Sequence, residues 1–315
     1  RDLDDVDRMV AAAEKGGSAV VIGGGLLGLE AAHGLSLRGM QVNVIHLMPT
    51  LMERQLDEAA GYLLKSELER RGQTIVTGAD TAEIVEQDGH VAGVRLKDGR
   101  EFAADIVVMA VGIRPSVALA KAAGLEVERG VMVDDHMVTS DPLIMAVGEC
   151  VQHRGACYGL VAPLWEMCRA LADAATGSPS GYTGSVTSTK LKVSGIDLFS
   201  AGDFSGGDGA EDIVMRDAAR GIYKRVIVKD DRLIGAVLYG DTVDGNWYFD
   251  LLKKGEDVSD IREALIFGQA FASGGALQDP NAAVAALSDD AEICGCNGVS
   301  KGKVVATIAG GACSL

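Results

Sequence analysis

The chain has 315 residues, of which 48% are hydrophobic and 23% are charged, a composition typical of globular proteins with sizeable cores. This length predicts two or three domains. The net charge of −16 argues against nonspecific binding of nucleic acid, whose phosphates require a basic surface. No apolar run reaches the roughly 18 residues of a membrane span, and no signal peptide is recognisable. We therefore expect neither a nucleic-acid partner nor a membrane partner.

The six cysteines are too sparse and too unevenly spaced for the disulfide framework of a secreted protein. This usage predicts a reducing compartment, and hence a cytoplasmic protein. Three of them, Cys150, Cys157 and Cys168, lack the C-x-x-C or C-x-x-x-x-C spacing of a redox disulfide, so we expect ordinary buried or partly buried thiols there.

The first hundred residues alternate between helical and strand patterns. Apolar residues at helical spacing predict a helix over 2–15, which ends at Gly16-Gly17. The segments that follow read as strand, helix, strand, helix, strand over 19–23, 26–38, 41–46, 56–71 and 74–77. This order is typical of an α/β fold with a parallel sheet.

The first predicted strand runs into the glycine pattern G-x-G-x-x-G at Gly23, Gly25 and Gly28. Gly23 permits a tight turn, Gly25 lets the backbone approach a pyrophosphate, and Gly28 lets the helix pack close to the strand. The helix begins at Leu26 and Leu27, where unpaired N–H groups and a partial positive charge favour phosphate. The pattern between a strand and a helix therefore predicts a dinucleotide site; the alternative is a turn that only packs the helix on the strand.

After residue 82 the pattern alternates with a period of two, and Asp88-Gly89 and Asp98-Gly99 predict hairpin turns. This is typical of a small antiparallel meander. A buried strand over 105–110 follows and ends before Gly112, so 18–112 reads as a Rossmann-like nucleotide-binding domain with an inserted β-meander.

The remainder of the chain reads as shorter pieces separated by two polar, small-residue linkers over 176–184 and 273–290. The patterns predict strands at 131–133, 144–147, 187–193, 223–228 and 233–239, a helix after Pro163, and helices at 247–253 and 258–267. We therefore expect a small α+β domain over 184–272.

Several of these segments resemble the pyridine-nucleotide-linked flavoprotein reductases: 1–17, 23–30, 106–114 and 141–149. The strings 46–57 (HLMPTLMERQLD) and 182–202 resemble more closely the NADH-dependent nitrite reductase large subunit family, and the electron-transfer subunit of assimilatory nitrate reductase has the same architecture. The resemblance implies a linker helix over 1–17, the returning half of a split FAD-binding domain over 113–178, and a truncated [2Fe-2S] segment over 290–315.

The resemblance also implies that segments are missing. No second glycine fingerprint for an FAD-binding half is present, the chain starts at Arg1 rather than Met, and nothing in it could carry siroheme. We therefore expect a fragment that binds NADH weakly and retains neither FAD nor an iron–sulfur cluster.

Two residues near the glycine turn are candidates for nucleotide contacts. His46 ends the second strand, where an acidic residue usually bonds the adenosine ribose 2′-hydroxyl. A histidine can bond a hydroxyl, tolerate a 2′-phosphate if protonated, or simply face water, so the residues leave NADH and NADPH open and only the resemblance favours NADH. The resemblance places Glu30 near the nicotinamide; the alternative is a solvated helix residue.

The resemblance assigns roles to three further residues. Gly112 lets the cofactor approach the end of the last strand, although a simple domain-exit turn is equally consistent. Gly148-Glu149 resembles the second flavin motif, which usually has Asp, and without the other half of the domain we expect it to be vestigial.

Cys294-Gly295-Cys296 resembles half of a bacterioferritin-associated-ferredoxin-like [2Fe-2S] site. Such a cluster needs four thiolates, and the C-x-x-C that would supply the other two is absent. Cys294 and Cys296 are therefore candidate ligands of an incomplete site.

The function implied by the resemblance is NAD(P)H oxidation. Hydride passes from the nicotinamide to FAD, and electrons pass on through iron–sulfur centres to a nitrite- or nitrate-reducing domain or subunit. The cofactors carry this chemistry, so no catalytic acid–base pair is expected. Two alternatives remain: a non-enzymatic nucleotide-binding or docking fragment, and a stand-alone NADH:rubredoxin-type reductase. A homodimer is left open.

Overall fold

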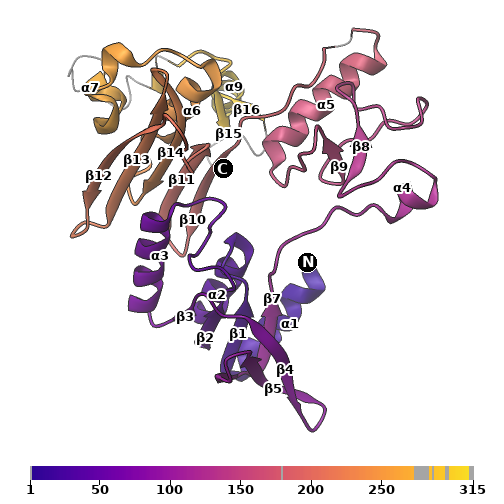
Figure 1. Cartoon of the computed structure of the whole chain (residues 1–315), viewed down its shortest axis with the longest axis vertical. Helices are drawn as coiled ribbons and strands as arrows, with labels where there is room; N and C mark the ends of the chain where they lie inside the picture. Colours follow the sequence, from indigo (N-terminus) through magenta and orange to yellow (C-terminus); the bar gives the residue numbers. More distant parts are fainter. Residues whose placement is uncertain (1, 179, 273–283, 286, 295–297, 312–315) are drawn as a thin grey trace. The chain divides into compact units, whose positions relative to one another are not determined.

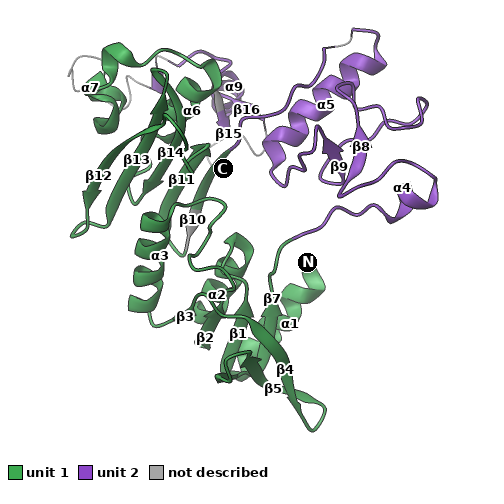
Figure 2. Ribbon diagram, in the orientation of Figure 1, with its two compact units in different colours: residues 1–112, 188–272 green, residues 113–187, 273–315 purple. Residues whose placement is uncertain are grey.

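A computed structural model describes residues 2–178, 180–272, 284–285, 287–294 and 298–311 of the chain. The chain divides into two units, which are coloured separately in Figure 2. Unit 1 contains residues 1–112 and 188–272, and unit 2 contains residues 113–187 and 273–315.

The N-terminal part of unit 1 is built on a four-stranded parallel sheet with the order β3-β2-β1-β7 (Figure 1). Its strands are β1 (Ser18–Ile22), β2 (Gln41–Ile45), β3 (Thr74–Val76) and β7 (Ile106–Met109). Its helices are α1 (Leu3–Lys15), α2 (Leu26–Leu37) and α3 (Glu58–Arg70). Residues Ala19, Val20 and Val21 of the central strand are fully buried, which explains the uninterrupted apolar run there. The predicted Rossmann-like α/β fold is confirmed.

Side chains and turns fix where these helices begin and end. Asp2 caps α1 by accepting a hydrogen bond from the N–H of Asp5 at 3.0 Å, and Asp57 caps α3 by accepting one from the N–H of Ala60 at 3.0 Å. Each cap satisfies a backbone donor that the helix itself cannot pair.

An antiparallel meander of order β4-β5-β6 lies between β3 and β7, as the sequence predicts. Its strands are β4 (Thr81–Gln87), β5 (His90–Leu96) and β6 (Glu101–Ala103). Asp88 and Gly89 both have positive φ, 53° and 79°, the backbone that the first hairpin turn requires.

The C-terminal part of unit 1 is a five-stranded antiparallel sheet of order β10-β11-β14-β13-β12, followed by the α-helices α6 and α7 and by short 3-10 turns between them. The strands are β10 (Ser188–Val193), β11 (Ile196–Gly202), β12 (Glu211–Asp217), β13 (Ile222–Lys229) and β14 (Arg232–Tyr239). The helices are α6 (Gly245–Lys254), the 3-10 turns η1 (Ser259–Ile261) and η2 (Leu265–Phe267), and α7 (Gln269–Ala272).

Two expectations for this part differ from the structure. The segment 258–267 forms two 3-10 turns and not one helix. Its residues Val258, Leu265 and Ile266 are buried in the hydrophobic core beside the sheet, and this packing outweighs the local helical pattern. The strands β11 and β12 were not predicted, because the buried pattern of β11 is interrupted by Asp197 and β12 is rich in charge.

The two parts of unit 1 share one hydrophobic core. Leu64 and Leu68 of α3 belong to the same buried cluster as Leu198, Val237 and Tyr239 of the antiparallel sheet. The hydroxyl of Tyr239 also donates a hydrogen bond to the carbonyl oxygen of Leu63 at 3.3 Å.

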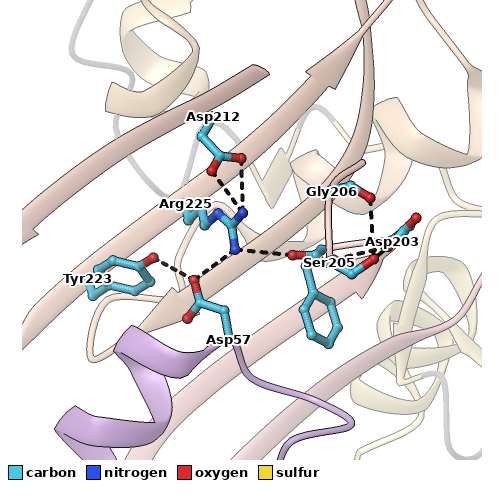
Figure 3. A network of polar contacts seen from close by, with 8 residues as sticks. Asp57, Asp203, Ser205, Gly206, Asp212, Tyr223 and Arg225 are labelled. Atoms are coloured by element: carbon cyan, nitrogen blue, oxygen red, sulfur yellow. Dashed lines mark hydrogen bonds and ion pairs between the residues drawn. The ribbon is translucent and has the colours of Figure 1, made fainter. Parts of the chain in front are cut away.

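A polar network surrounds Asp57 beside this core (Figure 3). Its Oδ2 accepts hydrogen bonds from the hydroxyl of Tyr223 at 2.6 Å and from Nη1 of Arg225 at 3.1 Å. Arg225 also donates to the carbonyl of Phe204 at 3.2 Å and to the carboxylate of Asp212 at 2.8 Å. Burial, reinforced by the hydrogen bond to Asp57, raises the pKa of Tyr223 far above its ordinary value, so its hydroxyl remains a donor.

The described residues of unit 2 form fewer helices and strands than those of unit 1. Over 113–187 it contains α4 (Ala118–Ala122), α5 (Val161–Ala175) and the parallel pair β8 (Val131–Val133) and β9 (Val151–His153). The predicted strand over 144–147 is reduced to a single bridge between Val138 and Met145. The described C-terminal residues form β15 (Glu292–Cys294), β16 (Val299–Ser300) and α9 (Lys301–Ala309).

None of the helices in the described part of the chain has both the length and the apolarity needed to cross a bilayer.

Replacing Asp57 by Ala should lower the free energy of unfolding by about 2–4 kcal/mol, because it removes a helix cap and leaves the Tyr223 hydroxyl without its acceptor. Asp212→Ala is the matched control. Its carboxylate binds the same arginine but is 47% exposed, so its loss should cost less than about 1 kcal/mol. Urea denaturation measures both, and equal losses would contradict the account.

Glu67 should make the free energy of unfolding of unit 1 depend on pH in the acidic range. Hydrogen bonds from Arg70, together with Arg71, lower the pKa of this carboxyl from its ordinary 4.5 to about 2. A depressed folded-state pKa stabilises the fold above the unfolded pKa, and the contribution is lost as the pH falls toward 2.

Glu67→Gln should therefore lower the free energy of unfolding by about 1–2 kcal/mol at pH 7, and the difference from wild type should shrink between about pH 5 and pH 2. Glu69→Gln, which removes a more exposed carboxylate 3.9 Å from Lys65, serves as control. A difference for Glu67→Gln that stays constant with pH would show that the ion pairs with Arg70 and Arg71 do not contribute.

Candidate functional site

The turn between β1 and α2 lies at the carboxyl edge of the parallel sheet, where open α/β sheets bind their ligands. Gly23 has φ +118° and donates its N–H to the carbonyl of Ile45 at 2.8 Å. A Cβ on Gly23 would lie 2.2 Å from the carbonyl oxygen of Ala110. Only glycine therefore fits where the chain passes between the ends of β2 and β7.

The other two fingerprint glycines have different surroundings. A Cβ on Gly28 would lie 2.0 Å from the carbonyl oxygen of Gly23, so this glycine allows α2 to pack against the turn. A Cβ on Gly25 would meet no atom within 4 Å. Gly25 is the N-cap of α2 and provides no capping side chain, and the first turn, with Leu26 and Leu27, contains no acidic residue. The first N–H groups of the helix have no helical partner, and the space at the Cβ position of Gly25 is open, a combination that suits an anion.

His46 follows β2 directly and is 8% exposed. Its Nδ1 accepts a hydrogen bond from the N–H of Gly24 at 3.0 Å, and its Nε2 lies 3.0 Å from Oε2 of Glu53. The structure therefore brings His46 together with the glycine turn and with an acidic residue seven positions further along the chain.

The loop that carries Glu53 is attached to the same turn. The N–H of Met52 donates to the carbonyl of Gly24 at 3.0 Å, and Met52 has a positive φ of 52°. Leu51 and Met52 are fully buried, and a Cβ on Gly24 would lie 2.5 Å from Cδ2 of Leu51 and 2.8 Å from Cγ of His46. Gly24 is thus confined by side chains on one side and hydrogen-bonded through both backbone groups.

Sequence reasoning missed Gly24 and Glu53. The glycine pattern leaves Gly24 as a variable position, and the strand-end pattern points to His46 itself rather than to an acidic residue seven positions later. The available signals were the run of three consecutive glycines, of which Gly24 is the middle one, and the string 46–57, which carries the family resemblance and contains Met52-Glu53.

Two further predicted residues lie near this sheet. Gly112, with φ +100° and open space at its Cβ position, follows β7, the parallel neighbour of β1. Glu30 is an exposed residue of α2 and lines a groove between α1 and α2, together with Val6 and Arg38.

The remaining predicted residues belong to unit 2. Gly148 has φ +109° and precedes the exposed Glu149. Cys294 ends β15, whereas Cys296 lies outside the described residues. Cys150, Cys157 and Cys168 are free thiols of intermediate burial. The described residues include no cluster of three or more His, Cys, Asp or Glu side chains that could hold a metal ion.

Comparison with known families gives two matches. The pyridine nucleotide-disulphide oxidoreductase family matches residues 1–170, and the rubredoxin NAD+ reductase C-terminal domain matches residues 188–256.

Among curated proteins, the chain is 49% identical over 315 residues to a nitrite reductase [NAD(P)H] of Bacillus subtilis. It is 41% identical over 307 residues to the assimilatory nitrate reductase electron transfer subunit of the same organism. These alignments cover 100% and 96% of this chain but only 38% of each relative. Among solved structures, a ferredoxin reductase from Rhodopseudomonas palustris is 26% identical, with a TM-score of 0.71 over 81% of this chain and 69% of that chain.

The geometry predicts different effects for two of the fingerprint glycines. Gly25→Val should weaken NADH binding at least about tenfold, because its side chain would occupy the open space, while costing less than about 1 kcal/mol of stability. Gly28→Val should cost roughly 1–3 kcal/mol or more through overpacking against Gly23. Calorimetric titration and denaturant unfolding separate the two effects. Unchanged NADH affinity in Gly25→Val would contradict the assignment.

Proposed function

Because the chain belongs to the pyridine nucleotide-disulphide oxidoreductase family, we propose that it is the nucleotide-binding, electron-transfer part of an NAD(P)H-dependent nitrite or nitrate reductase. The observation that carries the proposal is the open space at the Cβ position of Gly25, which is the N-cap of α2 and lies at the carboxyl edge of the parallel sheet. The curated relatives supply the class of reaction, because they align with 100% and 96% of this chain at 49% and 41% identity.

The residues present at the turn fit a dinucleotide. The N–H groups of Gly25, Leu26 and Leu27 would hold the pyrophosphate against the positive end of the helix. Gly112 would leave room for the nucleotide at the neighbouring strand end, and the exposed carboxylate of Glu30 would accept a hydrogen bond from the carboxamide. When bound, the nicotinamide and the flavin supply the hydride and electron transfer themselves. The side chains of this chain bind and orient, and none has to act as an acid or base.

The flavin and the iron–sulfur centre belong to the proposed longer reductase, whereas we expect this chain alone to retain neither. Gly148 and the exposed Glu149 would contribute hydrogen-bond acceptors to an FAD. Cys294 and Cys296 would supply two of the four thiolates that a [2Fe-2S] cluster requires. We place the protein in the cytoplasm, with NADH as the preferred reductant and a nitrite- or nitrate-reducing domain as the electron acceptor.

A second candidate acceptor follows from the match of residues 188–256 to the C-terminal domain of rubredoxin NAD+ reductase. That domain type favours a small one-electron iron protein as the partner. The alignment with nitrite reductase, which covers the whole of this chain and 38% of that relative, supports the first candidate more strongly.

Calorimetric titration with NADH, ADP-ribose and nicotinamide mononucleotide tests the proposal on the chain as it stands. Apart from the single exposed contact of Glu30 with the carboxamide, the proposed contacts serve the pyrophosphate and adenosine half, so ADP-ribose should bind within about threefold of NADH and the mononucleotide at least about tenfold more weakly. Absence of binding by both NADH and ADP-ribose would refute the nucleotide site and favour a docking fragment.

A further inference from the structure

The imidazole of His46 is fully occupied by two protein partners. The N–H of Gly24 donates to Nδ1 at 3.0 Å, so Nδ1 is unprotonated and the ring proton of the neutral imidazole lies on Nε2. That Nε2–H points to Oε2 of Glu53, 3.0 Å away. Neither ring nitrogen is left to bond a ribose hydroxyl directly.

The carboxylate of Glu53 is held at the end of β2 by two separate attachments. One is the Nε2–H of His46, and the other is the loop backbone, since the neighbouring Met52 donates to the carbonyl of Gly24 at 3.0 Å. The Glu53 side chain is 30% exposed. Its Oε2 faces His46, and within the described part of the chain Oε1 has no protein partner.

This arrangement supplies a carboxylate near the end of β2, where the strand end itself has none. In dinucleotide-binding folds an acid at the end of the second strand, about 20 residues after the glycine turn, bonds the adenosine ribose 2′-hydroxyl. Here that position is His46, and its imidazole links the strand end to a carboxylate from the following loop. The imidazole of His46, through its two hydrogen bonds, connects this carboxylate to the backbone N–H of Gly24 in the glycine turn.

Resting on the nucleotide site proposed above, we propose that Glu53 accepts the hydrogen bond of the ribose 2′-hydroxyl and selects NAD(H) over NADP(H). His46 is then a positioning residue that acts through Glu53. A carboxylate at this place favours a hydroxyl and repels the 2′-phosphate of NADP(H), so selection has both an attractive and a repulsive component.

Glu53→Gln tests the role of the charge, because glutamine keeps the size of the side chain and the site is partly exposed. The dissociation constant of NADH should rise about 10–100-fold, as expected for loss of a hydrogen bond to a charged group, while that of NADPH should fall or change less than about threefold. The ratio of the two constants, at least about tenfold in wild type, should therefore approach one. Glu58→Gln, an exposed glutamate in the same region, should leave the ratio unchanged.

His46→Leu and His46→Gln test the positioning role. Glutamine can keep a donor toward Glu53 and leucine cannot, so the leucine variant should lose most of the coenzyme preference and the glutamine variant should retain part of it. Combining His46→Leu with Glu53→Gln should change the ratio little beyond Glu53→Gln alone, because both changes remove the same contact. A purely structural role of His46 would change the melting temperature without changing this ratio.

The outcomes separate this inference from the proposed function. If wild type binds neither NADH nor ADP-ribose, both fail. If wild type binds NADH but Glu53→Gln keeps the NADH to NADPH ratio, only the role of Glu53 is overturned. It is also overturned if wild type prefers NADPH and the adjacent, exposed Arg54 proves responsible, which Arg54→Gln would show by removing that preference.

Discussion

The nucleotide-binding part of the structure depends on a close approach of backbones that only glycine permits. At Gly23 a Cβ would lie 2.2 Å from the carbonyl oxygen of Ala110, and at Gly28 it would lie 2.0 Å from the carbonyl oxygen of Gly23. These contacts bring the ends of β1 and β7 and the first turn of α2 together. The same packing leaves Gly25 facing open space, so the features that hold the turn also expose the N–H groups that suit a phosphate.

From this turn a continuous series of contacts leads into the antiparallel sheet. Gly24 is bonded to His46 and to Met52, and the loop that begins there ends at Asp57, the cap of α3. Asp57 in turn accepts hydrogen bonds from Tyr223 and Arg225. The loop that carries Glu53 is therefore fixed at both ends, which is what a specificity residue on a loop needs if it is to keep its geometry.

The sequence predicts the parallel sheet, the meander and the glycine turn well, because each depends on local patterns: a buried apolar strand, Asp-Gly turns, and glycines at fixed spacing. It does not predict the partner of His46, because the contact with Glu53, seven positions later, depends on how the loop between β2 and α3 folds back over Gly24. The Asp57–Arg225 pair joins residues 168 positions apart, and no periodicity signals it. For the same reason the charged strand β12 was missed, since its pairing with β13 outweighs its own weak pattern.

The central claim is that the glycine turn, His46 and Glu53 form one preorganised nucleotide site. Nitrogen-15 NMR of the histidine side chains tests it most directly, with His46→Gln used to assign the His46 resonances. At neutral pH the account predicts an unprotonated Nδ1 and a protonated Nε2 on His46, and a shift of that Nε2 resonance and of the Gly24 and Gly25 amides when ADP-ribose is added. A His46 imidazole that exchanges freely between tautomers, with no response of these resonances to ADP-ribose, would contradict it.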